Sequence, residues 1–417
     1  MKRIYLDYAA TTPVDSQVLE AMLPYFKEEF GNASSIHQEG RRAQAAVDKA
    51  RTVLANFLGC QPKEIIFTSG ATESNNLAIK GVVAAAKIKK PHLVTTAFEH
   101  PAVLETCRVL ERVGLAEVSY LRPSSEGLIE VEQVERAIRK NTVLVSIMYA
   151  NNEIGTILPI REIGKLLQRV NKTRQQKIYF HTDAVQAVQF LNCDVRYLKV
   201  DLLSLSAHKI YGPKGIGALY VKAGTPIVRQ QDGGEQEGRK RAGTLNVAGI
   251  VGLGKAVELI RKIHQQVARV QRQEISSTKP SPIVDCDYCD RIATLRDLLW
   301  ARLREIGGVE LNGSLQNRLP NNLNVSFAGV EGEGLLISLD LEGVAVSTGS
   351  ACSSRSLLPS HVLLAIGKSE SQAHSSLRIT LGKFTSREEI EEAAELIKKH
   401  VARLRKIAGS KISKEQK

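Results

Sequence analysis

Residues 204–217 read SLSAHKIYGPKGIG, and the interpretation of the whole chain begins at this stretch. An apolar strand pattern ends beside His208 and Lys209, and a turn rich in glycine and proline follows. Open α/β sheets bind ligands at the carboxyl ends of their strands. An isolated lysine in a basic chain is usually a surface residue, but this position predicts that the Lys209 amine lies in a binding site.

Short apolar segments alternate with longer helical patterns on both sides of this stretch. Such alternation is typical of βαβ units, which form a mostly parallel sheet with helices on both faces. The sequence therefore predicts an α/β fold. The expected strands are 64–67, 92–96, 143–148, 178–181, 202–205, 216–221 and 322–327, and the expected helices are 75–86, 103–112, 131–139, 160–170, 251–271, 292–306 and a terminal helix from Arg387.

The pattern changes after about residue 250, where a Pro- and Ser-rich stretch follows a long helix. We expect a large α/β domain at 16–260 and a smaller α+β domain formed by 1–15 together with 261–417. Residues 272–291 are expected to be an inserted, exposed loop, because prolines and polar residues interrupt the helical periodicity. Residues 407–417 are expected to form a basic tail.

The composition indicates an ordinary globular protein of 417 residues, 43% of them hydrophobic and 24% charged. No apolar signal-peptide region follows the first basic residues, and no membrane-length apolar run occurs, so we expect a cytoplasmic protein. Six cysteines are too few for a disulfide scaffold. The net charge of +13 invites nucleic-acid binding, but much of the excess lies in the terminal segment without interleaved aromatic residues, so we expect no direct nucleic-acid or membrane partner.

Polar groups follow several other predicted strands. Asp183 could keep a pyridine nitrogen protonated, as pyridoxal phosphate requires, or could cap the next helix. Residues 68–76, TSGATESNN, lead from a strand through Gly70 into a helix whose first turn would attract a phosphate. His100 could stack on a flat cofactor and exchange protons, and Asn152 could bind a ring hydroxyl. Together these groups predict a pyridoxal 5'-phosphate site.

At these positions the chain resembles the cysteine desulfurases of the NifS/IscS type, which are pyridoxal-phosphate enzymes of the class V aminotransferase fold. The resemblance extends from about Leu6 to Phe384. It implies the aspartate aminotransferase-like fold type I, a homodimer, and a sulfurtransferase that converts L-cysteine to L-alanine. The motifs are DYAATTP (7–13), GNASSIH (31–37), TSGATESNN (68–76), EHPAVL (99–104), NNEIG (151–155), DAVQ (183–186), SAHKIYGPKG (206–215), RAGT (241–244), GSACSS (349–354) and SLRITLG (376–382).

The resemblance also assigns roles to single residues. It implies that Lys209 holds the cofactor covalently and later moves the proton at the substrate Cα. It implies that Asp183 pairs with the pyridine nitrogen and that His100 stacks on the ring as a catalytic residue. The remaining implied residues are Asn152 and Gln186 at the ring hydroxyl, Ala71, Thr72, Ser206, His208 and the second subunit's Thr244 at the phosphate, and Arg378 and Asn32 at the substrate carboxylate.

Cys352 lies in the run of small residues 347–356, STGSACSSRS, which predicts a mobile loop. An isolated cysteine is more often a buried structural residue, but an ionised thiol is a strong nucleophile. The resemblance implies that Cys352 attacks the substrate sulfur and becomes a persulfide. The sulfur would pass to an iron–sulfur scaffold or a tRNA- or cofactor-thiolation enzyme. No intrinsic metal is expected, although Cys352 could be a transient iron–sulfur ligand through its persulfide.

Two features depart from the family. Residues 233–244, GGEQEGRKRAGT, carry Glu235 and Arg239 where the family has glycines, which puts the backbone of this dimer-contacting loop in doubt. Cys286 and Cys289 form a CxxC pair in the expected insertion, and without further ligands nearby we interpret them as part of a plain exposed loop rather than a zinc or redox site. Other activities of the fold, such as selenocysteine lysis or transamination, remain alternatives, although transamination needs no second nucleophile.

Overall fold

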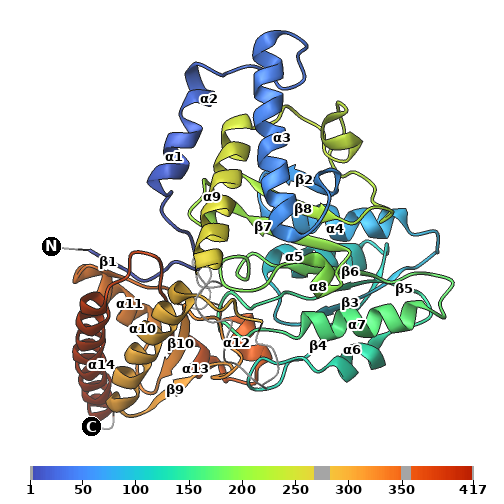
Figure 1. Cartoon of the computed structure of the whole chain (residues 1–417). Coiled ribbons are helices and arrows are strands. Elements are labelled where there is room, and N and C mark those ends of the chain that lie inside the picture. Colours follow the sequence, from blue (N-terminus) through green and yellow to red (C-terminus); the bar gives the residue numbers. More distant parts are fainter. Residues whose placement is uncertain (1–2, 267–281, 349–357, 416–417) are drawn as a thin grey trace, which may run out of the picture.

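The computed structural model describes residues 3–266, 282–348 and 358–415. A large part built around a seven-stranded sheet stands above a smaller part that contains both the N-terminal strand and the C-terminal helix (Figure 1). None of the described helices is long and apolar enough to cross a membrane.

The large sheet has the strand order β2-β8-β7-β6-β5-β3-β4. All neighbouring strands are parallel except that β8 runs antiparallel to both β2 and β7. Most of these strands are buried along their whole length, as expected for a sheet covered on both faces. The strands are β2 (Ile65–Thr68), β3 (His92–Thr96), β4 (Glu117–Leu121), β5 (Thr142–Ser146), β6 (Tyr179–Asp183), β7 (Leu202–Ser206) and β8 (Gly217–Val221).

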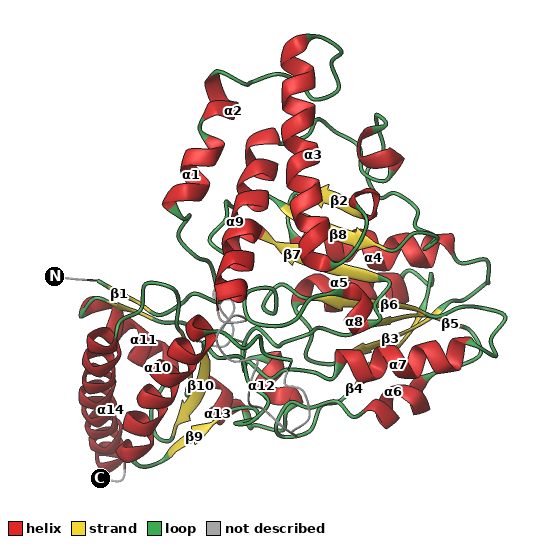
Figure 2. Ribbon diagram, viewed as in Figure 1, coloured by secondary structure: helices red, strands yellow, loops and turns green. Residues whose placement is uncertain are grey.

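Helices cover the large sheet (Figure 2). The long helix α3 packs along α9, where Gly254 approaches Ala50 so closely that an added Cβ would lie 2.8 Å from the Ala50 Cβ. Gly59 ends α3 in the left-handed conformation, which glycine adopts without strain. The helices of this part are α1 (Ser16–Met22), α2 (Pro24–Lys27), α3 (Gln38–Leu58), α4 (Ala71–Ala85), α5 (Pro101–Arg112), α6 (Val131–Ala137), α7 (Ile160–Asn171), α8 (Val195–Leu198) and α9 (Val247–Gln266).

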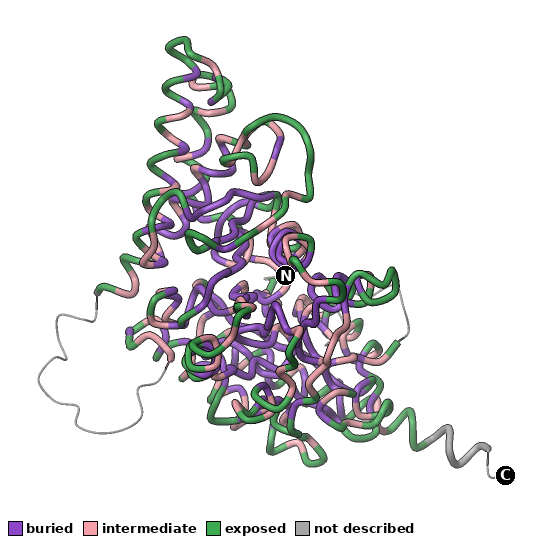
Figure 3. The backbone as a smooth tube through the Cα atoms, turned by 90° about the vertical axis from the view of Figure 1, so that its right-hand side faces the viewer, coloured by how far each residue is buried: buried purple, intermediate pink, exposed green. Residues whose placement is uncertain are grey.

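The smaller part contains an antiparallel sheet, β12-β10-β9, and a parallel pair formed by β1 and β11. Buried residues run through the interior of both parts, and exposed residues dominate their outer turns (Figure 3). The pairing of β1 with β11 supports the assignment of 1–15 to the small domain, although the domain boundaries stay a prediction. The elements are β1 (Ile4–Tyr5), β9 (Val309–Leu311), β10 (Asn322–Phe327), β11 (Val344–Ala345), β12 (Ser376–Thr380), α10 (Asp287–Leu303), α11 (Gly332–Leu341), α12 (His361–Ala365), α13 (Glu370–His374) and α14 (Arg387–Glu415).

The α/β class and the predicted order of elements in the large part are confirmed. One expectation is wrong within the described residues. The exposed loop expected up to residue 291 ends earlier, because Cys286 caps the N-terminus of α10 and the side chains of Cys286 and Cys289 are buried. Strand β4 and helix α3 were not expected.

Candidate active site

A cavity of about 630 Å³ lies where the strands of the large sheet end. Its walls come from separate stretches of sequence that the topology brings together. The predicted site residues that line it are Ala71, Thr72, His100, Asn152, Asp183, Gln186, Ser206, His208, Lys209 and Arg378.

Lys209 stands directly after β7, in a single turn of 3-10 helix. Its Nζ donates hydrogen bonds to the backbone carbonyl oxygens of Ala9 (2.7 Å) and Ala10 (2.6 Å). The backbone N–H of Thr12 donates to the carbonyl of His208 at 2.9 Å. The N-terminal motif 7–13 therefore forms one wall of the cavity and orients the lysine amine.

Asp183 ends β6, and its side chain is nearly buried. One carboxylate oxygen accepts a hydrogen bond from Asn75 Nδ2 at 2.7 Å, and the other accepts from the backbone N–H of Val185 at 3.0 Å. The bond to Val185 is a local turn contact, and turns follow Asp183 in place of the helix that the capping alternative assumed. The bond to Asn75 orients the carboxylate from α4, and Asp183 also lines the cavity.

Two histidines of the cavity wall are biased towards their neutral forms. His100 caps α5, with its Nδ1 accepting the N–H of Ala102 at 3.1 Å. Burial lowers the pKa of His100, the Asp183 charge opposes this shift, and the Lys209 charge adds to it. Burial, with the charges of Lys209 and Lys214, lowers the pKa of His208 to about 4. Both imidazoles are therefore available as uncharged rings at neutral pH.

The N-terminus of α4 opens onto the cavity. Gly70 precedes the helix with a φ of 153°, a conformation that favours glycine, and no side chain caps the first turn. Gly217 lies so close that a Cβ there would come within 2.8 Å of the Gly70 Cα. Free N–H groups and the helix dipole make such an end a seat for an anion. Thr72 and Ser206 line the cavity there and can add hydroxyl donors.

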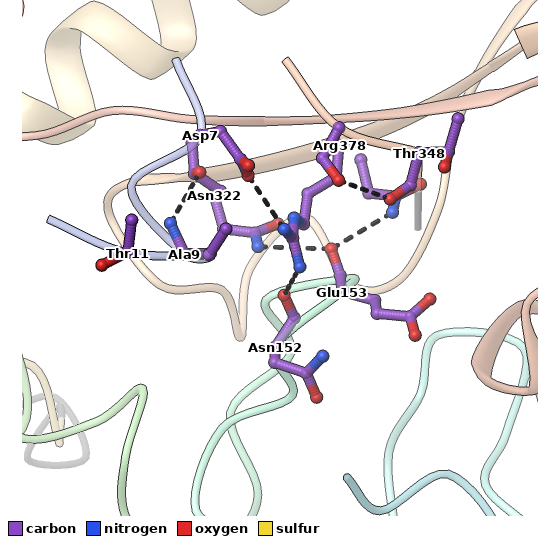
Figure 4. Close-up of polar contacts among 12 residues, drawn as sticks. Asp7, Ala9, Thr11, Asn152, Glu153, Asn322, Thr348 and Arg378 are labelled. Carbon is purple, nitrogen blue, oxygen red and sulfur yellow. Dashed lines mark hydrogen bonds and ion pairs between the residues drawn. The ribbon is translucent and has the colours of Figure 1, made fainter. Parts of the chain in front are cut away.

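Arg378 enters the cavity from β12, and its side chain is 3% exposed. Its guanidinium donates to the carboxylate of Asp7 at 2.9 Å and to the backbone carbonyl of Asn152 at 3.0 Å (Figure 4). Within the part of the chain that the structure describes, its buried Nε has no hydrogen-bond partner. Burial raises the pKa of Asp7, and the charges of Arg378 and Lys209 oppose that rise.

Two buried carboxyl groups beside the cavity were not identified from the sequence. Glu99 accepts hydrogen bonds from Thr96 Oγ1 and from the N–H of Met148, both at 2.9 Å. Burial raises the pKa of Glu99 to about 8 and that of Glu153 to about 7. Ser360 Oγ donates to Glu153. In the sequence, Glu99 directly precedes His100 and Glu153 directly follows Asn152. This adjacency to predicted site residues was the signal that could have identified the two glutamates.

The residues present fit pyridoxal 5'-phosphate. The cavity combines an amine, a nearly buried carboxylate and an uncapped helix start. Among the described residues, the buried side-chain oxygens of Asn75 and Asn152 lack hydrogen-bond partners, although both residues line the cavity. Buried polar atoms are normally satisfied, so these orphaned oxygens indicate a bound polar group.

Two of the predicted residues, Asn32 and Thr244, are not among the described residues that line this cavity. Asn32 is exposed, and its side chain accepts the N–H of Ser34 at 3.0 Å. Thr244 is exposed as well, so both stay predictions. Cys352 lies outside the described residues. The described ends of its segment are attached to the site: the backbone of Ser347 pairs with that of Arg378, and His361 Nε2 lies 2.9 Å from the Glu99 carbonyl oxygen.

Comparisons with known proteins identify the family of this chain. The family model Aminotransferase class-V matches residues 4–290 and 287–393. The chain is 49% identical over 411 residues to "Cysteine desulfurase IscS" of Dictyoglomus turgidum, covering 98% of this chain and 97% of that relative. It is 48% identical over 410 residues to the protein of that name from Neisseria meningitidis serogroup C, covering 97% of this chain and 94% of that relative.

Solved structures give the same result. A "NIFS-LIKE PROTEIN" matches with a TM-score of 0.84 and 35% identity, covering 96% of this chain and all (100%) of that one. "SspA in complex with cysteine" matches with a TM-score of 0.76 and 39% identity, covering 92% of this chain and 100% of that one. Fold and site define a protein of the class V aminotransferase type. The chain belongs to this family and, within it, to the cysteine desulfurases of the NifS/IscS type.

Proposed function

We propose that this chain is a pyridoxal-phosphate-dependent cysteine desulfurase that converts L-cysteine to L-alanine and transfers the sulfur to Cys352. The observation that carries the proposal is the convergence of Lys209, Asp183 and Arg378 on one cavity. The Lys209 amine can bind a cofactor aldehyde, and the Asp183 carboxylate can pair with a pyridine nitrogen. The Arg378 guanidinium can bind a substrate carboxylate.

The cofactor would be held by Lys209 through its amine, by Asp183 at the ring nitrogen, and by the start of α4 at the phosphate. When bound, pyridoxal phosphate supplies an electron sink that weakens bonds at the substrate Cα. Asn75 keeps the Asp183 carboxylate in place through its 2.7 Å hydrogen bond. His100 and Gln186 line the cavity where they can contact the cofactor ring.

Arg378 would bind the substrate carboxylate. A guanidinium offers two parallel donors to a carboxylate, which suits this role. Its Nη2 and Nη1 already hold Asp7 and the Asn152 carbonyl, and these contacts fix its orientation. The unpartnered Nε–H leaves a donor for the substrate.

Proton transfer would fall to Lys209 and His100. The Ala9 and Ala10 carbonyls accept from the Lys209 amine, and they orient it to take and return the proton at the substrate Cα. His100 is biased towards its neutral form because burial lowers its pKa. A neutral imidazole can take up the thiol proton of the substrate and return it.

The sulfur step would use Cys352, in agreement with the family resemblance. Its thiolate attacks the substrate Sγ, so a sulfur–sulfur bond forms while the Cβ–Sγ bond breaks. The electron pair of the broken bond stays with the substrate carbon, which takes up a proton and leaves as L-alanine. The persulfide then passes its outer sulfur to an acceptor, either an iron–sulfur scaffold or a thiolation enzyme, in the cytoplasm.

A homodimer is part of this proposal. The side chains of Leu19, Leu23, Phe26 and Phe30 in and beside α1 and α2 are 49%, 54%, 61% and 70% exposed. Exposed apolar surface of this extent is typical of a protein interface. A second copy covering this face would also explain why Thr244 is exposed in one copy while the family places it at a phosphate.

The identity of the reaction products tests the proposed function directly. Wild-type protein reconstituted with pyridoxal phosphate is incubated with L-cysteine and a thiol reductant, and the amino-acid and keto-acid products are quantified. We expect alanine and sulfide in equal amounts. Pyruvate and ammonia in place of alanine would show an elimination and contradict the proposal.

A further inference from the structure

Cys286 and Cys289 lie together at the start of α10, away from the cavity described above. Cys286 is the N-cap residue, and its Sγ accepts the backbone N–H of Cys289 at 3.3 Å. The two sulfur atoms are 2.7 Å apart. The helical turn therefore holds the two thiols in direct contact.

The surroundings of this pair do not provide a metal site. Zinc in structural sites takes four ligands, usually cysteine and histidine. In the described part of the chain, no group of three or more His, Cys, Asp or Glu side chains could hold a metal ion. Because the two sulfurs have no further metal ligands among the described residues, this geometry supports thiol chemistry.

The two thiols differ in acidity, as an exchange-active pair requires. The hydrogen bond between the two thiols lowers the pKa of the Cys286 thiol. The same contact raises the pKa of Cys289, and burial adds to that rise. The start of a 17-residue helix further favours a thiolate at Cys286.

The pair is buried between sequence neighbours that are exposed. Both side chains are buried, but the neighbouring Asp285, Asp287 and Asp290 are exposed. Because both thiols are buried, we expect a small neutral oxidant to reach them more readily than a protein-sized one.

We propose that Cys286 and Cys289 are a redox-active dithiol that a hydroperoxide converts to an intramolecular disulfide. The Cys286 thiolate attacks one peroxide oxygen, the O–O bond breaks, and the other oxygen leaves as hydroxide or alkoxide, so Cys286 becomes a sulfenic acid. The Cys289 sulfur, losing its proton, then attacks the Cys286 sulfur and displaces water. Two thiols are oxidised, one peroxide is reduced, and a thiol reductant reverses the change.

The disulfide would fix a contact between α10 and the loop that follows β6 of the large sheet. Tyr288, between the two cysteines, stacks on Phe190 with ring centroids 5.8 Å apart and planes at 6°. Its hydroxyl accepts a hydrogen bond from Gln189 Nε2 at 2.5 Å. A disulfide between Cys286 and Cys289, which flank Tyr288 in the sequence, would hold this ring in place.

Peptide mapping of the whole protein tests the proposal. The reconstituted enzyme is treated with hydrogen peroxide, quenched, unfolded and alkylated, and the tryptic peptide 273–291 is weighed; it contains no other cysteine. We expect it to lose two hydrogens and accept no label, and to regain both labels after dithiothreitol. Cys107 and Cys193 are buried and are free cysteines within the described part of the chain, and as internal controls they should stay fully alkylated.

A Cys289→Ser variant adds a second readout. It should give a sulfenic or over-oxidised Cys286 and no loss of two hydrogens, while Cys193→Ser should form the disulfide as the wild type does. The proposal is overturned if peptide 273–291 keeps both free thiols under conditions that oxidise Cys60 or Cys352. It is also overturned if Cys107 and Cys193 are oxidised equally fast, or if stoichiometric zinc is found on the pair.

Discussion

The carboxylate of Asp7 lies 2.9 Å from the guanidinium of Arg378, so the segment that follows β1 meets strand β12 beside the cavity. They are separated by 371 positions in the sequence. The pair is almost fully buried on the Arg378 side, and a buried ion pair is costly to break because the remaining charge is left without compensation. Asp7 therefore holds Arg378 in the cavity in the absence of a substrate carboxylate.

Arg378→Lys keeps the positive charge beside Asp7 but removes the planar pair of donors. We expect KM for L-cysteine to rise about 10- to 100-fold, which corresponds to a lost charged hydrogen bond of roughly 1.5–3 kcal/mol. Steady-state rates of alanine production measure this KM. Arg405→Lys at the surface of the small domain is the matched control. An unchanged KM would remove Arg378 from carboxylate binding.

Lys209→Ala should abolish the covalent attachment of the cofactor, because Lys209 is the lysine that stands at the end of β7. Lys214 also lines the cavity and gives a matched control, Lys214→Ala. Borohydride treatment followed by peptide mapping should find a reduced cofactor on Lys209 in the wild type and in the control. A cofactor fixed by borohydride in Lys209→Ala would reject the assignment.

Glu99 should make the fold less stable as pH rises. Its folded pKa is raised to about 8 by burial, whereas an unfolded glutamate titrates near ~4.3. The folded state therefore keeps a proton that the unfolded state releases, so this stabilisation is complete below pH ~4.3 and declines up to about pH 8.

Glu99→Gln removes that titration while keeping a neutral side chain of similar size. Relative to the wild type, its free energy of unfolding should gain about 3–4 kcal/mol between pH 5 and pH 8. Urea denaturation at both pH values measures the difference, and the exposed Glu132→Gln is the control. Parallel pH profiles of the Glu99→Gln and wild-type proteins would show that Glu99 is ionised when folded.

The exposed apolar face of α1 and α2 should join two copies. Phe26→Ser/Phe30→Ser is expected to shift the protein from dimer to monomer in sedimentation velocity, because two largely exposed aromatic rings lose their apolar contact area. Leu115→Ser, at a residue 58% exposed before β4, should leave the dimer intact. A wild type that sediments as a monomer at micromolar concentration would contradict the homodimer.

Strand β3, HLVTT, was predicted with its observed bounds because its apolar and β-branched residues, Leu93 to Thr96, are typical of a strand. Strand β4 was missed because it is an edge strand and all five of its residues are only half-buried. Helix α3 was missed although Ala43, Val47, Ala50, Leu54 and Leu58 follow helical spacing and Gly59 ends it. Here the periodicity was present in the sequence and was overlooked.

Ten of the predicted site residues line one cavity because residues at strand ends converge by topology, and the roles given to them stay predictions. What the sequence could not reveal was burial. Glu99 and Glu153 look like ordinary surface glutamates in the sequence, but the neighbouring elements enclose them. Prolines before Cys286 predicted a loop, and nothing in local spacing indicated that this cysteine caps a buried helix start.

The central claim is that sulfur moves from L-cysteine to Cys352, and mapping labelled sulfur tests it most directly. The wild type and Cys352→Ser are each mixed with L-cysteine carrying radioactive sulfur, and the unreduced peptides are separated. We expect label on the Cys352 peptide of the wild type, released by dithiothreitol. In Cys352→Ser we expect cofactor binding and a spectral change with L-cysteine, but no labelled persulfide and little alanine. Near-normal alanine production by Cys352→Ser, or label absent from the wild-type Cys352 peptide, would contradict the account.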